Sequence, residues 1–307
     1  LIKPLMHLSN NQLIISDDFS RTDKAPNFQN KAVYKCIDRN DLIAWLNANK
    51  ISLTWCIHIG ARTDTAEFNT AIFDTLNVDY TKALWNFCTI HNIPFIYASS
   101  AATYGDGQQG YSDMHNTAPL LKPLNPYGES KHRFDLWALA QNQSPPHWYG
   151  LKFFNVYGPN EYHKGRMASV VYHAFRQIQA TGKVKLFKSH RLDCADGMQQ
   201  RDFIYVKDLV KVILYLIQST PASGLYNLGT GHARSFNDLV AAVFNAMQIP
   251  QAVSYIDIPQ DIRETYQYFT QAQMDKLTQS GYKTPFYSLE NGIQEYVKQY
   301  LIFNAYE

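Results

Sequence analysis

The chain has 307 residues, of which 46% are hydrophobic and 18% charged, a balance that is typical of globular proteins and excludes a disordered chain. The 28 Lys and Arg residues against 26 Asp and Glu leave a net charge of +2, with no run of five like charges. A nucleic-acid-binding surface is therefore not indicated, and we expect no nucleic-acid partner.

Neither a membrane segment nor a cysteine framework is expected. No apolar run approaches the roughly 18 residues that a membrane helix needs, so we expect no membrane partner. The four cysteines, at positions 36, 56, 88 and 194, are single and form no Cys-x-x-Cys pair. The sequence therefore predicts neither a metal site nor disulfide bonds, and a reducing cytoplasm fits this usage.

Short apolar runs alternate along the chain with stretches of helical spacing, which predicts an α/β fold with a parallel sheet covered by helices. We expect strands over 13–15, 53–59, 93–98 and 148–154, and helices over 41–49, 69–91 and 126–139. Residues 1–8 also have the pattern of a helix. The stretches 105–125 and 189–200 lack apolar periodicity and are expected to be loops, and loops of such length are often functional.

A tyrosine and a lysine four residues apart, Tyr127 and Lys131, lie at the start of the helix predicted from residue 126 and share one helix face. Ser100 follows the strand over 93–98, at the sheet edge where open α/β folds bind ligands. An adjacent ammonium can stabilise a tyrosine phenolate, and a serine hydroxyl can orient a reacting oxygen. The pair alone is a weak signal and is more often structural, but the three residues together suggest proton-transfer chemistry.

Further motifs follow downstream: Phe-Phe-Asn-Val-Tyr-Gly-Pro at 153–159, His-Lys-Gly-Arg-Met-Ala-Ser-Val at 163–170, Gln-Arg-Asp-Phe at 200–203, Tyr-Asn-Leu-Gly-Thr-Gly at 226–231 and Tyr-Gln-Tyr-Phe-Thr-Gln at 266–271. With 99–105 and the Tyr127 and Lys131 pair, they resemble the extended short-chain dehydrogenase/reductases, and among these the ADP-L-glycero-D-manno-heptose 6-epimerases. The resemblance implies a modified Rossmann fold, a doubly wound parallel sheet with a smaller α/β substrate-binding lobe. It also implies epimerisation at C6 of ADP-D-glycero-D-manno-heptose through a 6-keto intermediate with bound NADP, for lipopolysaccharide core synthesis.

The resemblance also guides the expected organisation of the chain. We expect a dinucleotide-binding domain over 1–155, to which 202–231 and 286–307 return. A substrate-binding lobe is expected over 156–201 and 232–285. The family implies a cytoplasmic homo-oligomer, a pentamer, that acts on a small-molecule nucleotide sugar.

Carried over to matching positions, the resemblance implies that Tyr127 is one catalytic acid/base and Lys164 the second. It assigns Ser100 to orienting the reacting hydroxyl and Lys131 to the nicotinamide ribose. Groups on opposite sides of C6 suit an inversion, because hydride leaves one face of the centre and returns to the other. The alternative for Lys164 is a solvated surface lysine.

Two acids and three basic residues bear on the choice of cofactor. Asp17 and Asp18 follow a predicted strand and can meet an adenine ribose, which by itself suggests NAD. Arg21, Lys24 and Arg39 could neutralise a 2′-phosphate, so NADP is favoured and NAD remains possible. The resemblance adds a further set of cofactor-binding positions: Ile59, Gly60, Ala61, Arg62, Asn77, Lys131 and Val156. For Gly60, a structural role in a tight turn is the alternative to cofactor binding.

The nucleotide sugar is expected to bind at positions that match the family. A guanidinium suits a pair of pyrophosphate oxygens, which makes Arg201 the best of them chemically, although a salt bridge to Asp202 or another carboxylate is an equal alternative. Arg166 differs from the small polar residue of some family members. The full set of expected substrate-binding residues is Ser100, Asn155, Arg166, His173, Phe187, Lys188, Ser189, His190, Arg201 and Tyr266.

The sequence departs from the family pattern at its start, because it lacks the Gly-x-x-Gly-x-x-Gly turn that binds a pyrophosphate. We expect that roughly a dozen residues, one strand and this loop, precede the given chain. A UDP-hexose 4-epimerase is the alternative function, and a catalytically silent dinucleotide-binding scaffold is the second alternative. Sugar dehydratases are disfavoured because no acid follows Ser100 in the stretch 101–103.

Overall fold

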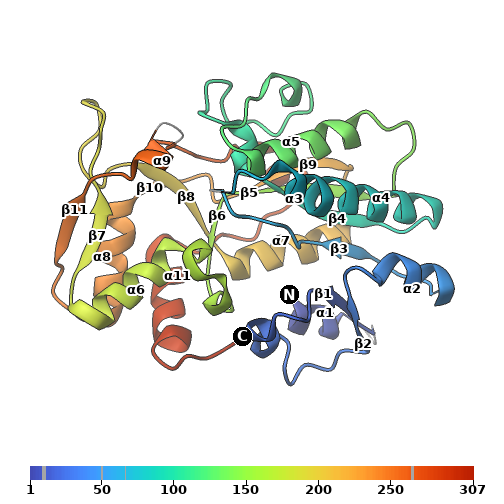
Figure 1. The fold of residues 1–307 in the computed structure, drawn as a ribbon, viewed down its shortest axis with the longest axis horizontal. Coiled ribbons are helices and arrows are strands. Elements are labelled where there is room, and N and C mark those ends of the chain that lie inside the picture. Colours follow the sequence, from blue (N-terminus) through green and yellow to red (C-terminus); the bar gives the residue numbers. More distant parts are fainter. Residues whose placement is uncertain (9–11, 50, 66, 264–265) are drawn as a thin grey trace.

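The computed structural model describes residues 1–307 except 9–11, 50, 66 and 264–265 (Figure 1). Its first half contains α1 (Ile2–His7), β1 (Ile14–Asp17), β2 (Lys35–Asp38), α2 (Leu42–Asn49), β3 (Cys56–His58), α3 (Thr70–Phe73), α4 (Tyr80–Ile90), β4 (Phe95–Ser100), α5 (Pro126–Leu139) and β5 (Trp148–Phe153). Short 3₁₀ helices cover Thr22–Asn27, Ala101–Tyr104 and Ala118–Leu120. The predicted strands and helices of this half are confirmed, with strand 53–59 shortened to β3.

The second half adds β6 (Asn155–Tyr157), α6 (Val170–Thr181), β7 (Val184–Phe187), β8 (Gln200–Tyr205), α7 (Val206–Ser219), β9 (Gly224–Leu228), β10 (Ala233–Ser235), α8 (Phe236–Met247), β11 (Val253–Ile256), α9 (Gln260–Arg263), α10 (Asp275–Gln279) and α11 (Leu289–Glu295). The segment Tyr162–Met167 is 3₁₀-helical and Tyr296–Leu301 is π-helical. None of the helices in the described ranges has the length and apolar character needed to span a bilayer.

Parallel strands form the centre of the molecule, in the order β3-β4-β5-β9, while β1 and β2 form a separate parallel pair. Successive residues of a strand point to opposite faces of its sheet. Accordingly, Phe95 and Tyr97 pack with residues of α4 and α5, whereas Ile96 packs with residues of α7. Helices therefore cover both faces of the sheet (Figure 1), which confirms the predicted doubly wound α/β architecture.

A second layered region lies beside the parallel sheet (Figure 1). It contains the three-stranded sheet β10-β8-β6 and the parallel pair β11-β7. Helices α6, α8 and α11 share one hydrophobic cluster, to which Val171, Val243 and Ile293 each contribute a side chain with no exposed surface. The last residue, Glu307, pairs with Lys3 and Lys207, which brings the two ends of the chain together.

The helix predicted over 69–91 changes its winding in the middle. Residues Asp74–Asp79 form a π-helical stretch between α3 and α4. Such stretches are rare and frequently occur at functional sites. Here the stretch contains the buried Asn77, one of the expected cofactor-binding residues.

Candidate active site

Ser100 and Tyr127 come together although they lie on different elements. Ser100 is the last residue of β4, and its hydroxyl accepts a hydrogen bond from the Ala102 backbone N–H at 3.1 Å, which starts the 3₁₀ turn after the strand. The Tyr127 hydroxyl lies within reach of a hydrogen bond with Ser100. The side-chain amide of Asn125 accepts from the Gly128 N–H at 2.8 Å and caps α5, with Pro126 as its first residue.

Gly128 allows α5 to approach the turn after β4 closely. A Cβ at this position would lie 2.8 Å from the Ala102 carbonyl oxygen, so a larger residue would push the helix away. This spacing holds Tyr127 beside Ser100. The Phe73 ring packs near Tyr127, with 6.4 Å between the ring centroids.

Burial sets the protonation of the two α5 residues. Lys131 is 4% exposed, and its burial lowers the pKa to about 8, while the negative charge of Asp135 acts in the opposite direction. Burial also raises the pKa of Tyr127, and the hydrogen bond with Ser100 offsets part of that rise. A further cation near the Tyr127 hydroxyl would favour its phenolate.

The π-helical stretch ties the segment after β3 to α5. Asn77 accepts from the Arg62 N–H at 2.9 Å and donates to the Arg62 carbonyl at 2.9 Å and to Ser130 Oγ at 3.0 Å. Gly60 does not have a positive φ, and a Cβ added there would meet nothing within 4 Å. Gly60 therefore faces open space and makes no tight turn. Its neighbour Ile59 is exposed, and Ala61 is half-buried. The side-chain Nε of Arg62 is buried and has no hydrogen-bond partner among the described residues.

The acids at the end of β1 are paired with the basic residues that follow them. Lys24 Nζ lies 2.7 Å from Asp17 Oδ1, and an Arg39 Nη atom lies 3.4 Å from Asp18 Oδ2. The Arg39 Nε is buried and has no partner among the described residues. Val156, on β6, is half-buried and packs against the cluster that contains Ile204.

Lys164 lies exposed on the 3₁₀ segment after β6. Its neighbour His163 contacts the segment after β1, since the Asn27 side-chain nitrogen lies 3.1 Å from His163 Nδ1 and Arg21 donates to the His163 carbonyl at 3.2 Å. Within the described chain, no hydrogen bond or ring contact connects Lys164 to Tyr127 or Ser100. The structure thus leaves both predicted roles of Lys164 open.

Other expected substrate residues surround the same segment. An Arg166 Nη atom lies 2.5 Å from Asp64 Oδ1, which connects the segment to the loop after β3. His173, on α6, reaches back to the Arg166 carbonyl at 3.3 Å. Asn155 lies exposed at the start of β6.

Arg201 is a buried cation surrounded by aromatic rings. It is 7% exposed, and its guanidinium lies 5.3 Å from the Tyr266 ring centroid and 5.7 Å from that of Phe236. It donates to the backbone carbonyls of Gln200, at 2.8 Å, and Gln267. Burial lowers the pKa of Arg201, and no described carboxylate pairs with the guanidinium.

From the sequence, a salt bridge between Arg201 and Asp202 is the alternative to pyrophosphate binding. That salt bridge is absent from the described structure. Asp202 instead accepts hydrogen bonds from the Thr230 N–H and hydroxyl, both at 2.7 Å, and from the N–H groups of Gly231 and Ala272. The strand β8 directs the two side chains to opposite faces, as expected for neighbouring residues. Arg201 therefore keeps donor capacity for an anion.

An aromatic group extends from Arg201 along the substrate-side strands. The ring centroids of Phe187 and Tyr266 are 6.0 Å apart, and Tyr268 lies 5.8 Å from Tyr266. The Tyr268 hydroxyl lies 2.9 Å from His190 Nδ1 and 3.3 Å from Ser189 Oγ. Lys188 points away toward Asp257, at 3.4 Å, with both side chains exposed. The structure thus brings four of the expected substrate residues together: Phe187, Ser189, His190 and Tyr266.

Sequence reasoning missed a buried ion pair beneath the α5 residues. Lys152 Nζ, on β5, lies 2.7 Å from Asp135 Oδ2, and neither side chain is more than 1% exposed. Asp135 follows Lys131 by four residues, so it continues the face of α5 that carries Tyr127. The spacing of four residues could have drawn attention to Asp135, but it could not identify Lys152 on β5 as its partner.

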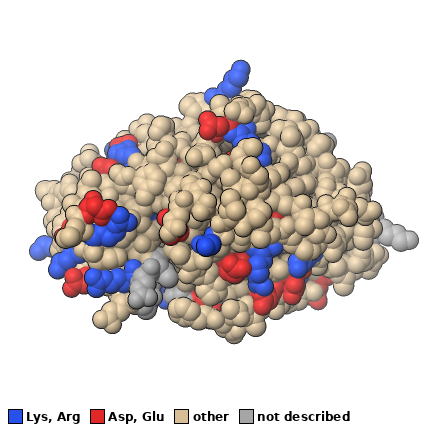
Figure 2. Space-filling view, turned by 90° about the horizontal axis from the view of Figure 1, so that it is seen from above, with Lys and Arg blue, Asp and Glu red and all other residues tan. Residues whose placement is uncertain are grey.

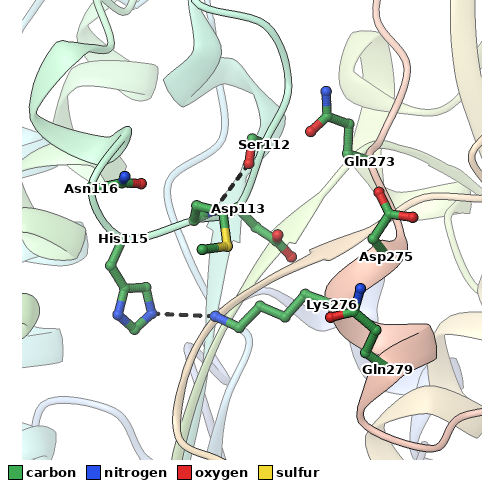
Figure 3. Close-up of a pocket in the computed structure, with 9 residues that line it drawn as sticks. Ser112, Asp113, His115, Asn116, Gln273, Asp275, Lys276 and Gln279 are labelled. Atoms are coloured by element: carbon green, nitrogen blue, oxygen red, sulfur yellow. Dashed lines mark hydrogen bonds between the residues drawn. The ribbon is translucent and has the colours of Figure 1, made fainter.

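A cavity of about 560 Å³ lies apart from these residues, between the long loop after β4 and α10 (Figure 3). Its wall holds the loop to the edge strand β9: His115 Nε2 accepts from the Leu225 N–H at 3.1 Å, and Lys276 Nζ lies 3.3 Å from the same nitrogen. Asp113 accepts from the Asn227 N–H at 2.8 Å. The loop 105–125 therefore covers an edge of the sheet.

The surface seen from above carries few charges, and basic and acidic side chains lie beside each other there (Figure 2). Among the described residues, no three His, Cys, Asp or Glu side chains are grouped so that they could hold a metal ion. The site thus consists of hydroxyl, ammonium, guanidinium and aromatic groups.

Comparison with known proteins agrees with this geometry. The family model described as "NAD dependent epimerase/dehydratase family" matches residues 17–229. ADP-L-glycero-D-manno-heptose-6-epimerase of Fusobacterium nucleatum is 46% identical, covering 94% of this chain and 90% of the relative, and that of Nitratidesulfovibrio vulgaris DP4 is 44% identical with the same coverage.

Solved structures give the same picture. The Helicobacter pylori ADP-L-glycero-D-manno-heptose-6-epimerase has a TM-score of 0.74 and 26% identity, covering 94% of this chain and 96% of that one. A UDP-glucose 4-epimerase from Thermotoga maritima, 19% identical, has a TM-score of 0.78 and covers 99% and 95% of the two chains, which shows a shared fold. The chain therefore belongs to the NAD dependent epimerase/dehydratase family, in its branch of ADP-L-glycero-D-manno-heptose 6-epimerases.

Proposed function

We propose that this protein inverts C6 of ADP-D-glycero-D-manno-heptose to give ADP-L-glycero-D-manno-heptose, by oxidation to a 6-keto sugar and reduction on the opposite face. The observation that carries the proposal is that Ser100 and Tyr127 lie within hydrogen-bonding reach of each other, one helical turn from the buried Lys131. Relatives that are 44–46% identical and named for this activity support the choice of substrate. The product is a precursor for the lipopolysaccharide core.

The residues around the site fit a nicotinamide dinucleotide. Lys131 is a buried ammonium with no carboxylate within salt-bridge distance among the described residues, Gly60 faces open space, and buried Nε atoms of Arg39 and Arg62 lack partners. When bound, the cofactor supplies removal and return of hydride. We assign Lys131 to its ribose, Asp17 and Asp18 to the adenosine end, and Ile59, Gly60, Ala61, Arg62, Asn77 and Val156 to its backbone.

NADP is the proposed form of the cofactor, with NAD as the alternative. Lys24 and Arg39 neutralise Asp17 and Asp18, whose carboxylates would otherwise repel a 2′-phosphate. The family description and several solved relatives name NAD, so the test compares the two forms directly.

Tyr127 is proposed as one acid/base, with its phenolate stabilised by the Lys131 ammonium. In the oxidation step, one base accepts the C6 hydroxyl proton while Ser100 holds the reacting oxygen by a hydrogen bond. After the planar ketone turns over, an acid on the other side returns a proton to the new alkoxide. Lys164 is proposed for that second position, where the contacts of His163 with Asn27 and Arg21 fix the segment that carries it.

Arg201 is proposed to bind the pyrophosphate of the substrate. Its guanidinium has no carboxylate partner among the described residues and is surrounded by the rings of Tyr266 and Phe236. A buried cation of this kind attracts an anion strongly. The remaining substrate contacts are proposed for Asn155, Arg166, His173, Phe187, Lys188, Ser189 and His190.

We also propose the division of the chain into a dinucleotide-binding domain over 1–155, with returns at 202–231 and 286–307, and a substrate lobe over 156–201 and 232–285. The packing of Ile96 with Ile213 and Tyr226 supports the first return. A homo-oligomer, specifically a pentamer, and a cytoplasmic location are further proposals that follow from the family.

The proposal is tested by incubating the protein with ADP-D-glycero-D-manno-heptose and, separately, with UDP-galactose. Proton NMR then follows inversion at C6 of the first and C4 of the second. We expect inversion at C6 alone, and mass analysis of released cofactor should identify NADP. Inversion at C4 alone would favour a UDP-hexose 4-epimerase, and no reaction with either would favour a silent scaffold.

A further inference from the structure

Helix α5 carries three polar residues on one face, four residues apart: Tyr127, Lys131 and Asp135. The first two belong to the site described above, and the third lies deeper, with no exposed surface. A buried carboxylate is costly unless hydrogen bonds and a counter-charge compensate it. The partners of Asp135 therefore show what its position serves.

Asp135 is hydrogen-bonded mainly to β4, the strand that ends in Ser100. It accepts from Ser99 Oγ at 2.7 Å and from the Tyr97 hydroxyl at 3.0 Å. Its second route runs through Lys152, whose Nζ lies 2.7 Å from both Asp135 Oδ2 and Thr103 Oγ1. Thr103 in turn donates to the Ser100 carbonyl at 2.8 Å.

We propose that Asp135 is a positioning residue for the epimerase reaction, which joins the helix of Tyr127 and Lys131 to the strand of Ser100 and acts as the counter-charge for the Lys131 ammonium. The inference rests on the roles proposed above for Tyr127 and Lys131. Asp135 does not touch the substrate; it acts through the two α5 residues and Ser100.

The electrostatic half of this role follows from the titratable groups around Lys131 and Asp135. His58, on β3, is held neutral because burial and the Lys131 charge lower its pKa to about 3. Tyr97, on β4, stays protonated because burial raises its pKa well above the usual value. Lys152, on β5, is engaged with Asp135 itself. Among the described residues, Asp135 is thus the one acid that favours the charged form of Lys131 against burial, which lowers its pKa to about 8.

The expected consequence concerns the alkaline limb of activity. Phenolate stabilisation requires a charged Lys131, so activity falls as the pH rises through the Lys131 pKa. Replacing Asp135 by Asn keeps the shape of the side chain and removes its charge, which lowers that pKa further. Because the Asp135 charge raises the pKa of Lys131, its removal should move the alkaline limb of activity to lower pH.

The test is the pH profile of kcat/KM for the heptose reaction from pH 6 to 10, with wild type and Asp135→Asn. If the pKa of Lys131 decreases by about one pH unit, kcat/KM of the variant at pH 8 falls about fivefold relative to wild type. This loss comes on top of any loss at pH 6.5, where Lys131 is largely charged in both proteins. Ser99→Ala is the matched control: it removes one hydrogen bond to Asp135 but keeps the charge, so its limb should coincide with that of wild type.

Folding is controlled separately, because Asp135→Asn leaves the buried Lys152 ammonium without its carboxylate counter-charge. If that variant does not fold, Asp135→Asn with Lys152→Gln removes both charges and carries the same test. A loss of kcat/KM that is equal at every pH, with the alkaline limb unmoved, would overturn the inference. Asp135 and Lys152 would then be a purely structural ion pair. Full activity of Tyr127→Phe would instead overturn the proposed function on which it rests.

Discussion

Two buried lysines near the site, Lys131 and Lys152, should respond in opposite ways when each is replaced by methionine. Lys131 has no carboxylate within salt-bridge distance in the described chain, and burial lowers its pKa from 10.5 to about 8. Lys152 lies 2.7 Å from Asp135. Methionine keeps most of the aliphatic volume at both positions, so the comparison isolates the charge.

The magnitude follows from the lowered pKa of Lys131. One pH unit corresponds to about 1.4 kcal/mol, so keeping Lys131 charged in the folded protein at pH 7 costs about 3 kcal/mol. Lys131→Met should therefore raise the free energy of unfolding at pH 7 by up to about 3 kcal/mol while it abolishes the proposed support of the phenolate. Lys152→Met should lower it by about 3–5 kcal/mol, because Asp135 is left buried and unpaired.

The sign of the pH dependence adds a second check. Below pH 8 both folded and unfolded wild type hold the Lys131 proton, so the full cost is present. Between about pH 8 and 10.5 only the unfolded chain keeps that proton, and the cost decreases as the pH rises. Urea denaturation at pH 7 and pH 10 should show a gain for Lys131→Met that shrinks with pH. Destabilisation at pH 7, or a gain that does not change with pH, would refute the reasoning.

Three further predictions concern turnover, substrate binding and cofactor binding. Tyr127→Phe should reduce turnover about 10²- to 10⁴-fold with little change in the melting temperature, as measured by NMR rates and thermal unfolding, and full turnover would contradict its role. Arg201→Gln should raise the KM for the nucleotide sugar about 10- to 100-fold with a smaller change in kcat, since charged hydrogen bonds contribute about 1.5–3 kcal/mol; an unchanged KM would exclude pyrophosphate binding there. Arg39→Leu should weaken NADP more than NAD in calorimetric titrations, and equal weakening would exclude contact with a 2′-phosphate.

The parts of the fold that depend on local pattern could be predicted from the sequence. Alternation of apolar runs and helical stretches predicted β4, α5 and β5, and Pro126 marked the start of α5. The pairing of Tyr127 and Lys131 on one face follows from a spacing of four residues. The π-helical winding around Asn77 was not predicted, because apolar periodicity over 69–91 is compatible with a regular helix.

The parts that depend on distant pairing could not be predicted. Asp135 and Lys152 meet because α5 lies on the sheet at the level of β5, which no local motif encodes. Arg201 could have paired with Asp202, but the backbone N–H groups of Gly231 and Ala272 already occupy that carboxylate. Contacts between Asn27 and His163 join segments 136 residues apart, so only the folded chain reveals them.

In the proposed mechanism, the C6 hydrogen is removed as hydride and returned to the opposite face of the same carbon. ADP-D-glycero-D-manno-heptose carrying deuterium at C6, incubated with the protein in ordinary water, tests this step by NMR and mass spectrometry. We expect inverted product that retains the deuterium at C6. Inversion with loss of deuterium to water, or no inversion at C6, would contradict this mechanism.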